Sequence, residues 1–284
     1  THLSATYGLC VFRRGRKTMK KILAIVLCAC MICALLAGCG SSESPAAAVE
    51  GDVLKIGIFE PATGENGAGG MQEVLGARYA NKVVPSVTVN GKEYKIELVE
   101  VDNQSDKTAA VTAAQNLVSS GVIAVIGSYG SGVSIAAGST FEQAKIPAVG
   151  GSCTNPQVTL GNDYYFRVCF LDPFQGSVMA NFAKDEFSAA NAYVLSMLGE
   201  DYGSGLATYF VNAFEDLGGT VTSEQFPEGT SDFSAYIQNA INAGADVIFA
   251  PCATTYAAQI ITQAASAGFD KPITAGDTWE SSVI

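Results

Sequence analysis

Short apolar runs alternate with longer amphipathic segments from Val53 to the end of the chain, and Gly, Pro, Asn or Asp separates most of them. The short runs predict strands, and the amphipathic segments predict the helices between them. The predicted strands cover residues 53–59, 94–101, 122–126, 148–149, 192–196, 221–225, 247–250 and 273–275. The predicted helices cover residues 71–83, 107–119, 131–144, 174–187, 205–217, 233–243 and 256–267. This alternation indicates an α/β fold with parallel sheets covered by helices.

Two further signals refine this arrangement. Asn90-Gly91 separates two short apolar runs and predicts a β-hairpin. Asp172-Pro173 begins a second series of strands and helices, because proline fixes a turn there. We therefore expect two Rossmann-like lobes, residues 53–171 and residues 172–284, with a cleft between them. Ligands of such sheets bind beyond the carboxyl ends of the strands.

The segment before this region has the pattern of an export signal. Lys20 and Lys21 precede an apolar run over residues 22–36, which is 15 residues long and shorter than the roughly 20 residues of a membrane-spanning helix. The ending Leu36-Ala37-Gly38-Cys39 resembles the lipobox of bacterial lipoproteins. We expect residues 1–38 to be a signal peptide with an upstream extension. Cys39 would then carry a lipid that anchors the protein to the cell membrane, outside the cytoplasm.

The flanks of this predicted signal carry two further patterns. Arg13-Arg14 raises the alternative of a twin-arginine signal, although the flanking Gly15-Arg16 fits that signal poorly. Residues 39–52 are rich in Ser, Ala, Glu and Pro without an apolar period. This composition predicts a flexible tether between the lipid and the folded part.

Composition narrows the function once the predicted signal is removed. The chain holds 16 basic and 27 acidic residues, and six basic residues but no acidic ones precede Cys39. The remaining part would carry a formal charge of −17, which argues against nucleic acid as a partner. The single histidine, His2, also lies before Cys39, so the remaining part has no histidine for a catalytic triad or a zinc site. Besides the lipidated Cys39, three cysteines remain, which allow at most one disulfide: Cys153, Cys169 and Cys252.

Two loops are the best candidates for binding chemistry. Residues 127–132 follow a predicted strand and open a predicted helix with glycines, Ser128 and Ser131, so backbone N–H groups and hydroxyls can face an anion such as a carboxylate. Residues 150–156 form a similar loop. Neither loop matches a Walker A motif or a dinucleotide fingerprint. The alternative is that both are ordinary turns that cap helices.

Several short segments occur in a recognisable order in the same region. They are Leu54-Lys55-Ile56-Gly57-Ile58-Phe59, Pro61-Ala62-Thr63-Gly64, Gly76-Ala77, Ile126-Gly127-Ser128 with Ser131, Ile146-Pro147-Ala148-Val149, Tyr164-Tyr165-Phe166-Arg167 and Tyr202-Gly203-Ser204-Gly205. Their order resembles that of ABC-transporter substrate-binding proteins of the branched-chain amino-acid type. The resemblance covers the chain from about Val53 to its end. It implies the type I periplasmic-binding fold, in which two lobes close on a small ligand.

The resemblance also implies a set of ligand-binding residues. The ligand carboxylate would be held by Ser131 and by the loop that carries Ser152 and Thr154. The ligand ammonium group would meet Asp277, and Tyr202 would close over the ligand. Asp277 could instead be a turn residue, and Tyr202 a half-buried aromatic at the start of a helix. Trp279, the single tryptophan, could line the side-chain pocket or pack within its lobe.

Departures from the family pattern bear on the ligand. Residues 65–70 and Ala253 stand where several relatives present aromatic side chains, so a larger or more polar side chain than leucine is plausible, as is an amide or urea. The partners implied are a small-molecule ligand and the permease subunits of an ABC importer, with no cofactor and no metal. Relatives would continue after Ile284, so we expect a fragment with an exposed apolar sheet edge.

Two other classes of function stay open. A sensory receptor module with the same cleft would have an identical pattern. An enzyme that uses carboxylates, for example Asp102, Asp106 or Asp277, is a weaker alternative because aspartates at such positions commonly cap helices or turns.

Overall fold

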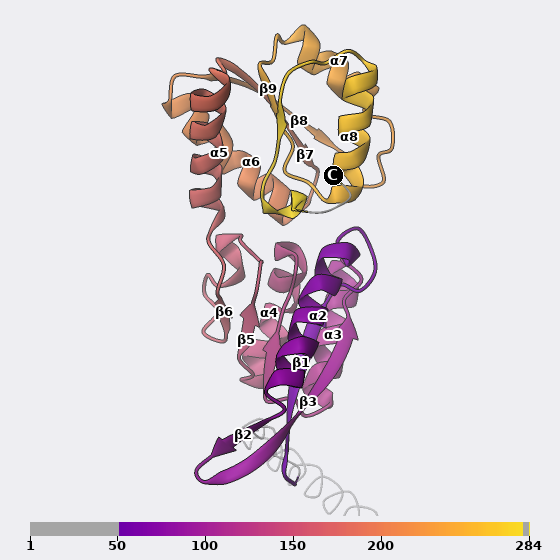
Figure 1. Cartoon of the computed structure of the whole chain (residues 1–284), viewed down its shortest axis with the longest axis vertical. Helices are drawn as coiled ribbons and strands as arrows, with labels where there is room; N and C mark the ends of the chain where they lie inside the picture. Colours follow the sequence, from indigo (N-terminus) through magenta and orange to yellow (C-terminus); the bar gives the residue numbers. More distant parts are fainter. Residues whose placement is uncertain (1–50, 281–283) are drawn as a thin grey trace, which may run out of the picture. The chain divides into compact units, whose positions relative to one another are not determined.

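The computed structural model describes residues 51–280 and Ile284 (Figure 1). The predicted signal peptide, Cys39 and most of the predicted tether lie outside the described residues. The first sheet has the strand order β2-β3-β1-β4-β5-β6. Its strands are β1 Val53–Glu60, β2 Ser86–Val89, β3 Lys92–Asp102, β4 Ala124–Ile126, β5 Ala148–Gly150 and β6 Tyr165–Arg167. The helices among these strands are α2 Gly67–Val83, α3 Lys107–Ser119, α4 Ser131–Ala144 and the short 3₁₀ helix η1 Pro156–Val158.

The second sheet follows in the chain and has the order β10-β9-β7-β8. Its strands are β7 Asn191–Met197, β8 Thr220–Phe226, β9 Val247–Phe249 and β10 Ile273–Thr274. Its helices are α5 Asp172–Phe187, α6 Asp201–Asp216, α7 Ser234–Asn242, α8 Thr254–Ser266 and the short 3₁₀ helix η2 Asp277–Trp279. All pairings in this sheet are parallel.

The first sheet is parallel except for one hairpin. Strand β1 lies at its centre, where Ile58 is opposite Glu100 of β3 and Ile126 of β4. Strands β2 and β3 pair antiparallel around Asn90-Gly91, and both of these residues have positive φ. A two-residue turn of this kind requires positive φ at both positions, which Asn and Gly adopt readily. The predicted α/β architecture and the predicted hairpin are both confirmed.

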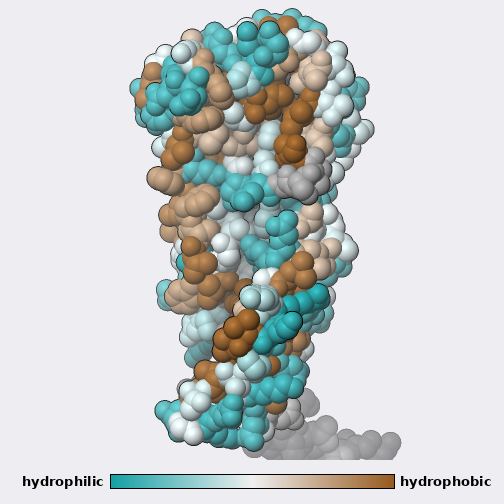
Figure 2. Space-filling model, in the orientation of Figure 1, coloured by the Kyte–Doolittle hydropathy of each residue, from teal (hydrophilic) through white to brown (hydrophobic). Residues whose placement is uncertain are grey.

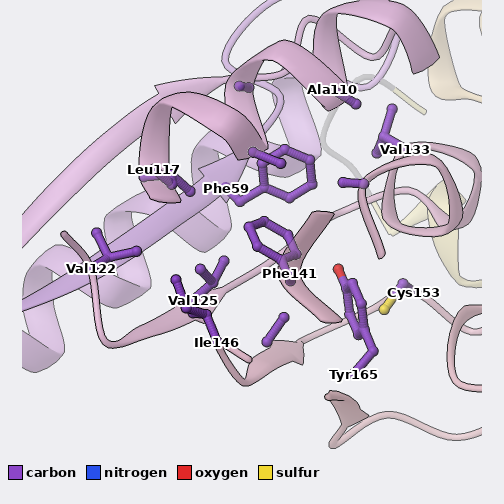
Figure 3. Close-up of a cluster of buried hydrophobic side chains, with 14 of the residues drawn as sticks. Phe59, Ala110, Leu117, Val122, Val125, Val133, Phe141, Ile146, Cys153 and Tyr165 are labelled. Carbon is purple, nitrogen blue, oxygen red and sulfur yellow. The ribbon is translucent and has the colours of Figure 1, made fainter. Parts of the chain in front are cut away.

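Separate apolar cores hold helices onto each sheet. Figure 3 shows the core of the first sheet, where Phe59 and Phe141 make an edge-to-face contact with ring centroids 5.5 Å apart. In the second sheet, Phe210 of α6 stacks on Phe249 of β9 with centroids 4.1 Å apart. Such aromatic pairs contribute about 0.5–1.5 kcal/mol beyond the burial of their apolar area. Helix α5 belongs to this second core through Ala180 and Ala183.

The largest differences from the predicted elements concern α2, α6 and β6. Helix α2 begins four residues earlier than predicted, because Gly67, Gly69 and Gly70 are helical here although glycine alone signals a loop. Helix α6 also begins four residues early, since the Glu200 carboxylate accepts the N–H groups that open it. Strand β6 was not predicted, because three residues are too few to give a periodic signal.

Apolar side chains are exposed along one face of α5 and the segment that leads into it. Phe170, Phe174, Val178 and Phe182 follow a helical spacing of four residues, and Phe174 is 63% exposed. Phe166 on the edge strand β6 is 51% exposed. Figure 2 shows apolar residues along the side on which α5 lies. Exposed apolar area of this extent is typical of surfaces that other polypeptide covers.

Within the described part of the chain, every helix is either too short or too polar to cross a bilayer.

The packing of α5 on α6 gives a stability prediction with a matched control. A Cβ at Gly176 of α5 would lie 2.7 Å from Tyr209 Cβ and 2.8 Å from the backbone nitrogen of Phe210, whereas Gly76 of α2 has no atom within 4 Å. We expect Gly176→Ala to lower the free energy of unfolding by about 1–3 kcal/mol through overpacking. Gly76→Ala should raise it by up to about 1 kcal/mol through helix propensity. Equal effects of the two substitutions in urea unfolding would contradict this close packing.

Candidate functional site

A narrow cavity lies between residues of the first sheet and residues of the second. Its lining comes from the loops and helix starts that follow the strands, as expected for parallel sheets. The first sheet contributes Glu65, Asn66, Tyr129, Gly130, Ser131 and Ser152. The second contributes Met197, Glu200, Tyr202, Cys252, Ala253, Tyr256, Asp277 and Thr278. Four of the six predicted ligand-binding residues therefore line one cavity: Ser131, Ser152, Tyr202 and Asp277.

Ser131 begins α4 at the edge of this cavity. Its Oγ accepts the backbone N–H of Asn155 at 3.1 Å, so the hydroxyl hydrogen remains available as a donor. The N-cap of α4 is Gly130, which offers no side-chain acceptor, and the first turn of the helix contains no acidic residue. The helix N-terminus thus keeps the partial positive charge that favours an anion.

Ser152 lies in the loop after β5 and is engaged with an acidic side chain. Its hydroxyl donates to Glu73 Oε1 of α2 at 2.5 Å. Behind Glu73 lies Glu60, which is 1% exposed and whose Oε2 accepts the Tyr129 N–H at 2.6 Å. Burial, together with the nearby Glu73 carboxylate, raises the pKa of Glu60 to about 10. Glu60 is therefore protonated at neutral pH, and the wall behind Ser152 holds one negative charge fewer than the sequence suggests.

Asp277 and Tyr202 form a hydrogen-bonded pair on the opposite side. The Tyr202 hydroxyl donates to Asp277 Oδ1 at 2.7 Å, and the Asp277 backbone N–H donates to Gln175 Oε1 of α5 at 2.6 Å. A side chain at Gly276 would collide with Tyr202 and Gln175, so glycine is required at this close approach. Burial raises the pKa of the Asp277 carboxyl, while the Tyr202 hydroxyl favours its ionised form.

The structure does not bring the other two predicted residues to the cavity. Thr154 is fully buried near the start of α5, where its backbone carbonyl oxygen accepts the Asp172 N–H at 3.1 Å. Trp279 donates from Nε1 to the Cys252 carbonyl oxygen at 3.0 Å and packs against the core of the second sheet. The second alternative for Trp279, packing within its lobe, thus matches its position. The thiols of Cys153, Cys169 and Cys252 are all free.

Several lining residues were not singled out from the sequence. Glu200 caps α6, and its carboxylate accepts the N–H groups of Tyr202 at 3.0 Å and Gly203 at 2.5 Å. Burial raises its pKa to about 7, although these two N–H groups act in the opposite direction. An acidic residue directly before a predicted helix is a recognisable N-cap signal, because its side chain can accept the N–H groups two and three residues later. This signal does not reveal a cavity. Glu65 begins the segment that the family pattern had marked as bearing on the ligand, but no role was assigned to its charge. Met197 and Tyr256 carry no motif that would have identified them.

The cavity is acidic. Glu65, Glu200 and Asp277 line it, and no Lys, Arg or His does so among the described residues. No cluster of three His, Cys, Asp or Glu side chains in the described part of the chain could hold a metal ion. The arrangement is suited to binding, because a donor-rich helix N-terminus and a partly buried carboxylate line the same cavity.

Comparison with known proteins identifies the family. A sequence model described as periplasmic binding protein matches residues 53–284. The chain belongs to the periplasmic binding protein family. Its two-sheet fold is that of the type I members, and a leucine-binding protein from Thermotoga maritima superimposes with a TM-score of 0.76 at 38% identity. That match covers 80% of this chain and 64% of the other protein.

Two further relatives agree with this assignment. A substrate-binding protein of a branched-chain amino-acid transporter from Streptococcus pneumoniae, solved with isoleucine, has 31% identity and a TM-score of 0.72 over 80% of this chain and 64% of that one. The Leu/Ile/Val-binding protein homolog 1 of Brucella suis biovar 1 is 34% identical over 232 residues, which are 80% of this chain and 61% of the relative. This periplasmic binding protein thus spans less than two thirds of the length of these relatives.

The pKa of Glu200 predicts how the stability of this family member varies with pH. Because folding raises the pKa from 4.5 to about 7, the folded state binds the Glu200 proton more tightly. The stabilisation is complete below pH 4.5 and is lost as the pH rises through 7. Glu200→Gln should flatten this dependence in urea unfolding across that range, whereas Glu215→Gln, an exposed change on the same helix, should not. Parallel pH profiles for the parent and Glu200→Gln would contradict the shift.

Proposed function

We propose that this chain is the ligand-binding part of an extracytoplasmic solute-binding protein that holds an amino acid or a related small polar ligand between two lobes, residues 53–171 and 172–284. The observation that carries the proposal is the pairing of Ser131 at a helix N-terminus with Asp277 across one cavity. A zwitterion has a carboxylate for the first and an ammonium group for the second. Charge-assisted hydrogen bonds of this kind are stronger than neutral ones, and a desolvated cavity strengthens them further.

Contacts between the two sides support a mechanism of closure on the ligand. The Lys107 ammonium group at the start of α3 lies 2.7 Å from Asp201 Oδ2 of α6 and donates to the Gly199 carbonyl oxygen at 3.2 Å. The Asn155 side-chain amide donates to the Asp201 carbonyl oxygen at 2.8 Å. These bonds join the two sides outside the ligand cavity. They would form on closure and break on release, as in a hinged two-lobe binder.

The relatives guide the cellular part of the proposal. The Streptococcus pneumoniae protein is described as belonging to a branched-chain amino-acid transporter, so we propose delivery of the ligand to the permease of an ABC importer. We also propose that a lipid on Cys39 anchors the protein to the cell membrane. Cell fractionation of the Cys39→Ser variant tests the anchor separately from ligand binding, and we expect this variant to lose its association with the membrane.

Amino-acid binding should depend on Asp277. Asp277→Asn leaves a ligand ammonium group without its counter-charge, so we expect about 10- to 100-fold weaker binding by calorimetry, since a hydrogen bond to a charged group contributes about 1.5–3 kcal/mol. Asp270→Asn removes an exposed carboxylate near the same strand and should leave the affinity unchanged. The screen should include amino acids, amides and urea. Equal affinities of Asp277→Asn and the parent would remove the zwitterion model.

The Lys107–Asp201 pair should contribute modestly to affinity without contact with the ligand. Its ammonium group and carboxylate are partly exposed, and such pairs contribute about 0–1 kcal/mol. We expect Lys107→Met to weaken binding no more than about fivefold, with a smaller loss at high salt because ions screen the pair. A double-mutant cycle with Asp201→Asn measures the coupling directly. Additive effects of the two substitutions would argue against the role of this pair in closure.

A further inference from the structure

Glu65 occupies a distinctive position among the residues that line the cavity. It lies in the loop between β1 and α2, and its backbone carbonyl oxygen accepts a hydrogen bond from Thr255 Oγ1 of α8 at 3.4 Å. Glu65 is half-buried and lines the ligand cavity together with Glu200 and Tyr256. The loop therefore places an acid from the first sheet against the start of a second-sheet helix.

The other two acids of this cavity are already engaged. The Glu200 carboxylate accepts two backbone N–H groups, and Asp277 accepts the Tyr202 hydroxyl. Glu65, by contrast, makes no ion pair with any Lys or Arg among the described residues. Burial and the neighbouring Glu228 raise its pKa, and only the Tyr256 hydroxyl is found to favour its ionised form.

Two apolar residues line the same cavity as Glu65. Ala253 and Met197 line the same cavity, and the small methyl group of Ala253 occupies little of it. Apolar groups suit the methylene stem of a long side chain, and the carboxylate suits a charged end. A zwitterion alone brings one positive charge, which the proposed function assigns to Asp277, so a half-buried carboxylate would remain uncompensated after closure.

We propose that Glu65 is a specificity-determining residue that selects amino acids with a cationic side chain. This inference rests on the proposed function and names its substrate class. The α-ammonium group of the ligand meets Asp277, and the side-chain cation meets Glu65 from the opposite sheet. A neutral side chain of equal length leaves Glu65 either unpaired or protonated, and both states weaken binding.

The test compares ligands that differ in one charged group. Lysine and norleucine share the same four-carbon side chain, and only lysine ends in an ammonium group. With the full chain, we expect calorimetry to give at least about 10-fold tighter binding of lysine, the lower end for a hydrogen bond between charged groups. Glu65→Gln should remove this preference and leave norleucine binding within about twofold of the parent, which also shows that the variant is folded.

Two control variants separate the possible outcomes. Glu228→Gln removes an acid from the same neighbourhood that does not line the ligand cavity, so it should keep the preference for lysine. Asp277→Asn should weaken both ligands. Equal binding of lysine and norleucine by the parent, or an unchanged preference in Glu65→Gln, overturns the role of Glu65 and leaves the amino-acid function standing. Failure of the parent to bind any amino acid overturns the proposed function and this inference together.

Discussion

The desolvated carboxylate of Asp277 is the constraint on which the cavity depends. A partly buried acid needs hydrogen-bond partners. Here the Tyr202 hydroxyl donates to the Asp277 carboxylate, and the Gln175 side chain accepts the backbone N–H of the same residue. Gly276 makes this approach possible, because any larger residue would displace both partners. The carboxylate is therefore oriented before a ligand arrives, which lowers the entropic cost of binding.

Two other acids near the cavity show how negative charge is reduced there, although no basic side chain among the described residues lines it. Glu60 behind Ser152 holds its proton at neutral pH, because burial and Glu73 together raise its pKa to about 10. Glu200 spreads its charge over the N–H groups that begin α6. Protonation of Glu60 and the hydrogen bonds to Glu200 both reduce the electrostatic repulsion that a ligand carboxylate would meet at Ser131. The negative charge that remains faces the cavity from Glu65 and Asp277, where a cation is of use.

The sequence predicts the fold well because its signals are local. The short apolar runs predicted most of the strands that the structure contains, and the Asn90-Gly91 turn predicted the hairpin. The family resemblance also predicted four ligand-binding residues that line one cavity in the structure: Ser131, Ser152, Tyr202 and Asp277. The segment that begins at Glu65 was recognised from the family pattern, but its charge was assigned no role, because its contact with a distant helix is not encoded in neighbouring residues. Glu200 was missed as a lining residue, since burial beside the cavity is not encoded there either. Trp279 was ambiguous for the same reason, because a carbonyl 27 residues away holds its indole.

A single turn of α5 connects the two walls of the cavity. Its first residue, Asp172, donates its N–H to the Thr154 carbonyl oxygen in the loop that also carries Ser152. Gln175, three residues later, accepts the N–H of Asp277. The Asp172 carboxyl group is buried there beside the Thr154 hydroxyl, and burial raises its pKa to about 6, although this hydroxyl acts in the opposite direction. In the proposed closure of the two lobes, a rotation of one sheet against the other about this turn would change the position of Asp277 relative to Ser152.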